Sequence, residues 1–195
     1  MGLVEELGRE WEAPALAARL MRDADLFQSS GGGVTLSGGE PLLQHEFAVE
    51  LLRLLPVHKA IETSGYADAA IFERVIAEVD YVMMDVKLAD PAEHRRYTGV
   101  DNALILENFH RLQASGKPHL VRVPLIPGIT DTRENLARIA AVVGDSPVEL
   151  LPYNRMAGAK YPSVGKTFTD QIDPDGGHEI DLSLFQNATL RRDAH

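Results

Sequence analysis

The sequence predicts an α/β fold in which parallel strands form part of a (β/α) barrel. Strand-like and helix-like stretches alternate, the connections between strands can each hold a helix, and the strands end in polar residues or glycine. Connections of this kind join parallel strands by crossovers. A complete barrel takes about 250 residues, and this chain has 195. A partial barrel is therefore favoured, and an open doubly wound sheet is also compatible.

Composition limits the kinds of partner. The chain carries 19 Lys+Arg against 29 Asp+Glu, a net charge of −10, which argues against a nucleic-acid partner. No apolar run reaches the roughly 20 residues of a membrane helix, and no signal peptide is visible. We therefore expect no membrane partner and a cytoplasmic location. The sequence has no cysteine, which excludes disulfides, a cysteine nucleophile and thiolate-held metal or iron–sulfur sites within it.

Amphipathic stretches and short apolar runs predict the elements in order. Predicted helices cover residues 10–27, 45–55, 68–78, 102–114 and 131–143, with a short one beginning at Pro91. Predicted strands cover residues 34–37, 59–63, 81–86, 119–124 and 148–151. Glycines at 31–33 end the first helix, and Asp131 with Glu134 resembles a capping box. Residues 1–168 are expected to form the partial barrel, and the polar segment 169–195 a loosely ordered tail.

Polar residues gather where the predicted strands end. They are Ser37, Gly38, Gly39 and Glu40, then Glu62 and Thr63, then Asp85 and Lys87, then Arg122, and finally Asn154. A charge inside an apolar strand is costly unless it is paired or faces a solvated cavity. Because the carboxyl ends of parallel strands meet at one edge, these residues predict one shared ligand site. Alternatively, Asp85 and Lys87 form a salt bridge, Arg122 extends to solvent and the glycines are ordinary turns.

The residue types at these strand ends suit a zwitterionic ligand. Glycines let a ligand reach main-chain N–H and C=O groups. Glu40 and Asp85 can face an ammonium group or hydroxyls, and Lys87 and Arg122 can hold a carboxylate. A molecule with an α-amino-acid end and a sugar fits this set. A Schiff-base lyase using Lys87 is an alternative, but Asp85 on the same strand face would stabilise the ammonium form and oppose it.

The motifs at the strand ends resemble one family. Residues 31–42 read GGGVTLSGGEPL, and the runs ETSGY, MMDVK, RVPLIPG and LLPYN follow in order at 62–66, 83–87, 122–128 and 150–154. This set is similar to the activating enzymes of glycyl radical enzymes, of the pyruvate formate-lyase activating enzyme type, in the radical S-adenosylmethionine superfamily. The resemblance covers about residues 10–168.

This resemblance implies roles for individual residues. It places Gly38, Gly39 and Glu40 at the amino group of S-adenosylmethionine, Lys87 and Arg122 at its carboxylate side, and Asn154 at its nucleoside part. It also implies a monovalent cation held by Glu62, Thr63, Met83 and Asp85. Glu62 stands where the family has Asp, so its side chain is one methylene longer.

The resemblance also implies an activity. In the family a 4Fe–4S cluster, held by a Cys-x-x-x-Cys-x-x-Cys loop, reduces S-adenosylmethionine to a 5′-deoxyadenosyl radical. This radical activates a partner glycyl radical enzyme, and a flavodoxin or ferredoxin-type protein donates the electron. The sequence lacks this loop and the strand before it. We therefore expect a truncated, inactive part of such an enzyme, with self-association through exposed strand edges. The alternative is a cluster-free binding module that keeps the S-adenosylmethionine or partner-docking surface.

Overall fold

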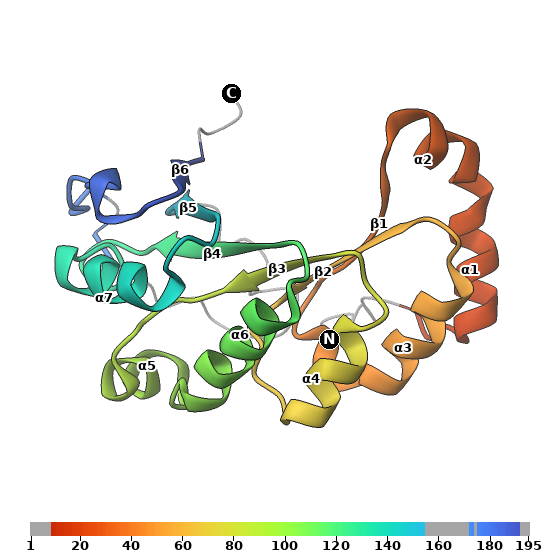
Figure 1. Ribbon diagram of the computed structural model, residues 1–195, viewed down its shortest axis with the longest axis horizontal. Helices are drawn as coiled ribbons and strands as arrows, with labels where there is room; N and C mark the ends of the chain where they lie inside the picture. The colour runs from red at the N-terminus through yellow and green to blue at the C-terminus, as the bar shows by residue number, and fades with distance from the viewer. Residues whose placement is uncertain (1–8, 155–171, 174, 192–195) are drawn as a thin grey trace, which may run out of the picture.

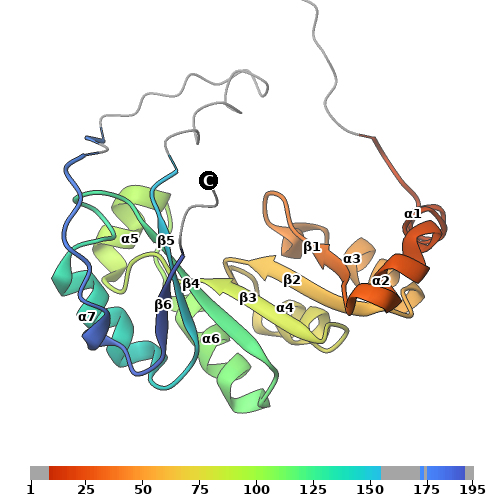
Figure 2. The same cartoon turned by 90° about the horizontal axis from the view of Figure 1, so that it is seen from above.

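A computed structural model describes residues 9–154, 172–173 and 175–191 of the chain. Six parallel strands form one sheet in the order β1-β2-β3-β4-β5-β6. The strands are β1 (Gly33–Leu36), β2 (His58–Thr63), β3 (Tyr81–Asp85), β4 (His119–Leu125), β5 (Val148–Pro152) and β6 (Ala188–Leu190). The sheet curves into an open arc, with β1 and β6 at its two ends and the helices on its outer face (Figures 1 and 2). The predicted partial barrel is therefore confirmed.

Alternating side chains on each strand separate a dry face from a polar one. On β3, Val82 and Met84 are fully buried in the main core, which lies between the sheet and the helices. Met83 and Asp85 alternate with them and therefore face the concave side of the sheet. The strand register places Asp85 beside Arg122. The polar side of the sheet is thus the inside of the arc.

The helices follow the predicted order. They are α1 (Ala13–Leu20), α2 (Ala24–Ser30), α3 (His45–Leu54), α4 (Ala69–Ile76), α5 (Pro91–Thr98), α6 (Ala103–Ser115) and α7 (Arg133–Val143). The single helix predicted at residues 10–27 is wrong, because a 3-10 turn at Met21–Asp23 separates α1 from α2. α1 buries Ala13 and Ala17 in a cluster with residues of α3, whereas α2 buries none of its residues. α2 contacts this cluster only through the partly buried Phe27, so its packing is weaker than that of α1.

The start of α7 differs from the predicted capping box. Thr132 is the N-cap, and its hydroxyl accepts a hydrogen bond from the Asn135 N–H at 3.2 Å. Asp131 is buried instead, and it accepts from the N–H groups of Gly128 (2.7 Å) and His178 (2.8 Å). Asp131 therefore links the loop after β4 to the C-terminal segment.

The sixth strand is one more than the sequence predicts. β6 pairs in parallel with β5, and Phe185 just before it is buried in the main core. Both lie in the segment 169–195 that was expected to be loosely ordered. The apolar residues there are few and closely spaced, which gives no clear periodic signal but suffices for one short edge strand. The predicted boundary at residues 168–169 lies outside the described residues.

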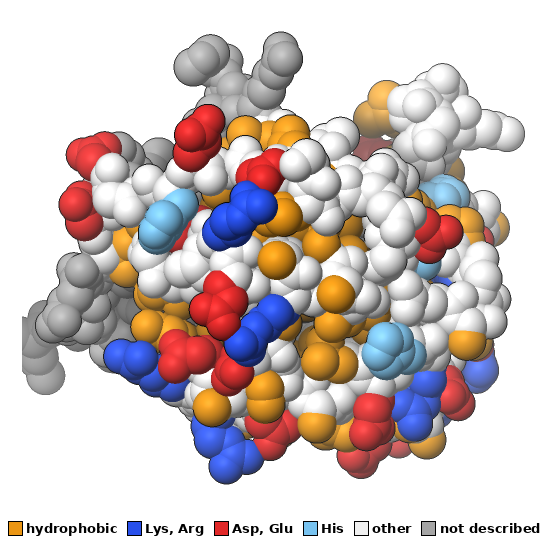
Figure 3. All heavy atoms as spheres, turned by 60° about the vertical axis from the view of Figure 1, so that its left-hand side comes forward, with side chains coloured by type: hydrophobic (Ala, Val, Ile, Leu, Met, Phe, Trp, Pro, Cys, Tyr) orange, Lys and Arg blue, Asp and Glu red, His pale blue; other side chains and the backbone are white. Residues whose placement is uncertain are grey.

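The outer surface is mixed in character. Acidic and basic side chains alternate with apolar atoms on the face that Figure 3 shows. In the described part of the chain, none of the helices has the length and apolar character that crossing a membrane requires.

Candidate functional site

A cavity of about 230 Å³ lies at the carboxyl ends of β1 to β4. Its lining residues come from four neighbouring strand ends: Ser37, Gly38, Gly39, Glu40, Glu62, Thr63, Ser64, Asp85, Lys87 and Arg122. The structure thus brings together every predicted site residue except Met83 and Asn154. Met83 lies on β3 two residues before Asp85, and Asn154 is an exposed residue after β5. Neither belongs to this lining.

Arg122 lies between two carboxylates. Its Nη1 is 2.7 Å from Glu62 Oε1, and its Nε and Nη2 are each 2.9 Å from Asp85 Oδ1. The side chain is only 13% exposed, so it does not extend to solvent, and that alternative is wrong. Burial by itself lowers the pKa of Arg122, but the attraction of Asp85 and Glu62 outweighs it and the pKa is raised. Arg122 is therefore a fixed positive charge.

Glu62 extends this network to β1. The Ser37 hydroxyl donates to Glu62 Oε2 at 2.6 Å. This hydrogen bond is the main cause of a lowered pKa for Glu62, and the charge of Arg122 lowers the pKa further. The chain Ser37–Glu62–Arg122–Asp85 joins the ends of all four strands, so hydrogen bonds and ion pairs hold the floor of the cavity.

Glu40 is bound by the protein itself. Its carboxylate accepts hydrogen bonds from the Thr63 hydroxyl (2.6 Å), from the N–H and hydroxyl of Ser64 (2.8 and 2.6 Å) and from the Leu42 N–H (3.2 Å). Both oxygens thus have two donors each. Glu40 fastens the loop after β1 to the end of β2, and this fixes the position of the two glycines before it.

Gly38 and Gly39 border open space. A Cβ at either position would meet no described atom within 4 Å. Gly38 has φ of 123°, a conformation that strongly favours glycine. The main chain of this loop is therefore accessible from the cavity, as the zwitterion interpretation requires.

Lys87 is the more accessible of the two cations. Its Nζ lies 3.5 Å from Asp85 Oδ2, and 34% of its side chain is exposed. The alternative that Asp85 and Lys87 form a salt bridge is therefore confirmed, and the pair lies inside the cavity. The Lys87 amine is thus paired with a carboxylate, which disfavours a Schiff-base role. With Glu40, Glu62 and Asp85 against Lys87 and Arg122, the lining suits a ligand that carries a positive group.

Three buried asparagines that the sequence analysis missed fix the loops around the cavity. Asn108 on α6 donates to the carbonyls of Gly65 and Ala67, at 2.9 and 2.8 Å, in the loop after β2. Asn102 donates to the carbonyls of Leu88 and Ala89, both at 2.9 Å, in the loop after β3.

Asn135 is the third of these buried asparagines. From α7 it donates to the Lys87 carbonyl at 3.1 Å and accepts from the Ala89 N–H at 3.0 Å. The available signal for such residues is an asparagine on the apolar stripe of a helix, as Asn108 lies between Ile105 and Leu112 on α6. The loops at the site are thus held from the helix layer.

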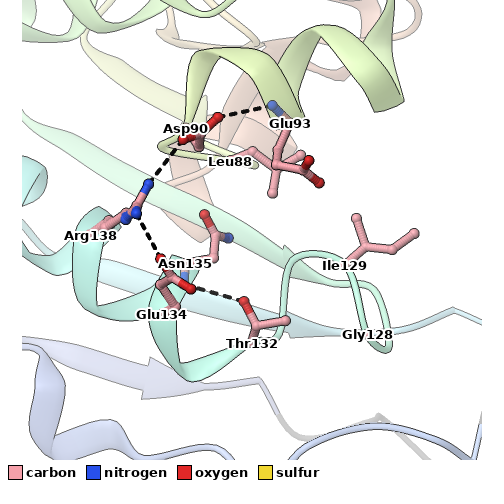
Figure 4. Close-up of a pocket in the computed structure, with 9 residues that line it drawn as sticks. All are labelled: Leu88, Asp90, Glu93, Gly128, Ile129, Thr132, Glu134, Asn135 and Arg138. Atoms are coloured by element: carbon pink, nitrogen blue, oxygen red, sulfur yellow. Dashed lines mark hydrogen bonds and ion pairs between the residues drawn. The ribbon is translucent and has the colours of Figure 1, made fainter.

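A second cavity, of about 250 Å³, lies between the first turns of α5 and α7 (Figure 4). Asp90 caps α5 by accepting from the N–H groups of Ala92 and Glu93, and it pairs with Arg138 at 3.0 Å. Arg138 also pairs with Glu134 at 2.6 Å. The polar groups of this cavity thus bind one another, and they connect the two helices.

The curved parallel sheet defines a partial (β/α) barrel, and its strand ends carry a cavity lined by charged side chains of both signs. The sequence model of the Radical SAM superfamily matches residues 8–140. The chain therefore belongs to the radical S-adenosylmethionine superfamily, whose members use S-adenosylmethionine and a 4Fe–4S cluster.

Two activating enzymes are among the proteins whose sequences are similar to this chain. Over 173 residues the chain is 38% identical to the 4-hydroxyphenylacetate decarboxylase activating enzyme of Clostridioides difficile, covering 84% of this chain and 54% of that protein. Over 172 residues it is 41% identical to the isethionate sulfite-lyase activating enzyme of Oleidesulfovibrio alaskensis, with the same coverage of 84% and 54%. The chain thus spans about half the length of these relatives.

The fold is also similar to solved structures, one of which is a domain of an activating enzyme. A domain of the pyruvate-formate lyase-activating enzyme from Bacteroides vulgatus aligns with a TM-score of 0.64 and 25% identity, covering 83% of this chain and 99% of that one. A radical SAM methyltransferase from Sphaerobacter thermophilus aligns with a TM-score of 0.62 and 17% identity, covering 95% of this chain and 59% of that one. This second likeness concerns the fold alone.

Proposed function

We propose that this chain forms the S-adenosylmethionine-binding part of a glycyl-radical-enzyme activating enzyme. The cavity at the ends of β1 to β4 carries the proposal, because it combines an accessible glycine main chain with fixed charges of both signs. The relatives named as activating enzymes support the reaction class. The partner is then a glycyl radical enzyme, the electron donor a flavodoxin or ferredoxin-type protein, and the location the cytoplasm.

The residues of the cavity fit S-adenosylmethionine. Gly38 and Gly39 offer main-chain groups to the amino end of the ligand, and the acidic excess of the lining favours its ammonium and sulfonium charges. In this proposal Lys87 binds the carboxylate of S-adenosylmethionine, and Arg122 is the less exposed cation on the same side of the ligand. We assign Asn154, at the end of β5, to the nucleoside part.

The same residues do not fit the iron–sulfur cluster. When bound, the cluster supplies the electron that cleaves S-adenosylmethionine in this superfamily. The 195 residues contain no cysteine, and thiolates are the usual cluster ligands. We therefore expect the chain by itself to bind S-adenosylmethionine without cleaving it.

Calorimetry with S-adenosylmethionine tests this proposal. We expect saturable binding to the 195-residue chain and a loss of about tenfold or more in affinity for Lys87→Met, because a charged hydrogen bond is removed. Lys59→Met is the matched control, since Lys59 lies at the amino end of β2, away from the cavity. The affinity of this variant for S-adenosylmethionine should equal that of the wild type. Absence of heat at millimolar ligand would refute the proposal.

The absence of cysteine from the sequence favours a second candidate, a cluster-free binding module. The two candidates share the cavity and differ in what the chain does when a cluster is supplied. The chain can be mixed with a cysteine-containing segment of a relative that is already loaded with its 4Fe–4S cluster, a reductant and S-adenosylmethionine. Formation of 5′-deoxyadenosine favours the activating enzyme, whereas a stable complex without this product favours the binding module.

A further inference from the structure

The guanidinium of Arg122 lies between Glu62 and Asp85, at the place where two carboxylates could share a metal ion. We infer that Arg122 is a built-in cation for this pair, so the wild-type site takes no monovalent metal ion. The family resemblance implies the opposite, namely a cation held by Glu62, Thr63, Met83 and Asp85. The contacts of these four residues distinguish the two arrangements.

Each carboxylate oxygen of the pair already faces a donor. Glu62 Oε1 accepts from Arg122 Nη1 at 2.7 Å, and Glu62 Oε2 accepts from the Ser37 hydroxyl at 2.6 Å. Asp85 Oδ1 accepts from Arg122 Nε at 2.9 Å, and Asp85 Oδ2 faces Lys87 Nζ at 3.5 Å. An ion that needs these oxygens would have to displace protein donors from them.

The other two expected ligands do not complete an ion site. The Thr63 hydroxyl donates to Glu40 at 2.6 Å and accepts from the Gly65 N–H at 2.9 Å. Met83 does not line the cavity.

Charge and side-chain length agree with this assignment. Arg122 and Lys87 neutralise Glu62 and Asp85, so an added ion would meet the repulsion of a guanidinium that is only 13% exposed. β2 and β4 are separated by β3, and the side chain of Glu62 reaches across β3 to Arg122. An aspartate at position 62 would be one methylene shorter, so the glutamate suits a contact with Arg122.

Thermal unfolding in different salts tests the inference without any S-adenosylmethionine, so it is independent of the proposed function. Midpoints are compared in KCl, NaCl and choline chloride at equal ionic strength. We expect the wild-type midpoint to be the same in all three. In choline chloride the unfolding midpoint of Arg122→Met should be lower than that of the wild type. Adding K⁺ or Na⁺ should raise the midpoint of this variant saturably, by about 3 °C, because the vacated carboxylates now bind the ion.

Arg111→Met is the matched control. Arg111 also lies between two carboxylates, 3.5 Å from both Glu73 and Glu107, but the side chains of both glutamates are 61% exposed. The unfolding midpoint of this variant should be the same in KCl, NaCl and choline chloride. A saturable K⁺ or Na⁺ response of the wild type would overturn the inference, and so would a folded Arg122→Met that responds to neither ion.

Sodium-23 NMR of the wild type decides the question if Arg122→Met does not fold. The inference predicts no specific broadening of the sodium signal by the protein. Broadening that added K⁺ reverses would overturn it.

Discussion

At the residue scale, Glu62 connects more of the site than any sequence pattern indicates. Its carboxylate binds Ser37 on one side and Arg122 on the other. Both contacts favour the ionised form, and the pKa of Glu62 falls below its usual value of 4.5. Ionisation of this one group therefore stabilises the folded state.

The lowered pKa of Glu62 predicts a pH dependence of stability. Above about pH 4.5 Glu62 is ionised in both the folded and the unfolded chain, so its contribution to the free energy of unfolding is complete. As the pH falls, the unfolded chain takes up the proton first, and the contribution is lost on passing through the folded pKa. Urea unfolding of Glu62→Gln should therefore show a smaller loss of stability on acidification than the wild type.

Glu50→Gln is the control for this measurement, because Glu50 is exposed on α3. Its loss of stability in acid should equal that of the wild type. Equal acid profiles for wild type and Glu62→Gln would contradict the prediction.

Sequence patterns predict which residues surround the cavity but not what each one binds. Strand periodicity places Asp85 and Lys87 on one face, and their salt bridge follows from that. The reach of Glu62 to Arg122, two strands away, and the four donors of Glu40 depend on side-chain conformation. The sequence analysis assigns Glu40 and Arg122 to a ligand, whereas in the structure both side chains bind other residues of the protein. Strand periodicity does not predict these contacts.

At the scale of the elements, helix α6 fixes the loop after β2 through Asn108. This side chain is 1% exposed and donates to two loop carbonyls. In Asn108→Ala both carbonyls lose their donor inside the protein, which should lower the free energy of unfolding by about 2–3 kcal/mol.

Urea unfolding checks the effect of Asn108→Ala. Asn187→Ala is the matched control, because Asn187 is exposed just before β6, and its free energy of unfolding should change by less than about 0.5 kcal/mol. If the two variants unfolded at the same urea concentration, the loop would not depend on Asn108.

Element boundaries are predicted well where the apolar pattern is long, as in α6 and β3. They are predicted poorly where packing decides. The break at Met21–Asp23 depends on which face finds a partner in α3, and β6 depends on pairing with β5. Neither of these contacts leaves a period in the local sequence.

At the scale of the whole molecule, the described sheet is open at both ends. β1 and β6 each have one neighbouring strand, and their free backbone groups can pair with another chain. We predict that the mass measured by sedimentation velocity rises with protein concentration. A monomer throughout the concentration range would contradict this.

Two variants indicate which edge is responsible for the association. Thr35 and Thr189 are exposed residues on β1 and β6. Lysine at a sheet edge opposes pairing between chains, so the variant at the associating edge, Thr35→Lys or Thr189→Lys, should remain monomeric. The other variant serves as its control.

The position of the buried asparagines has a consequence for how such a chain can change over time. They hold the loops from the helix side, while the groups that border the cavity lie on the opposite side of the sheet. Because the asparagines bind main-chain groups of the loops, substitutions of the cavity side chains leave these hydrogen bonds in place. The frame can therefore be inherited unchanged while the cavity side chains diverge toward a different ligand.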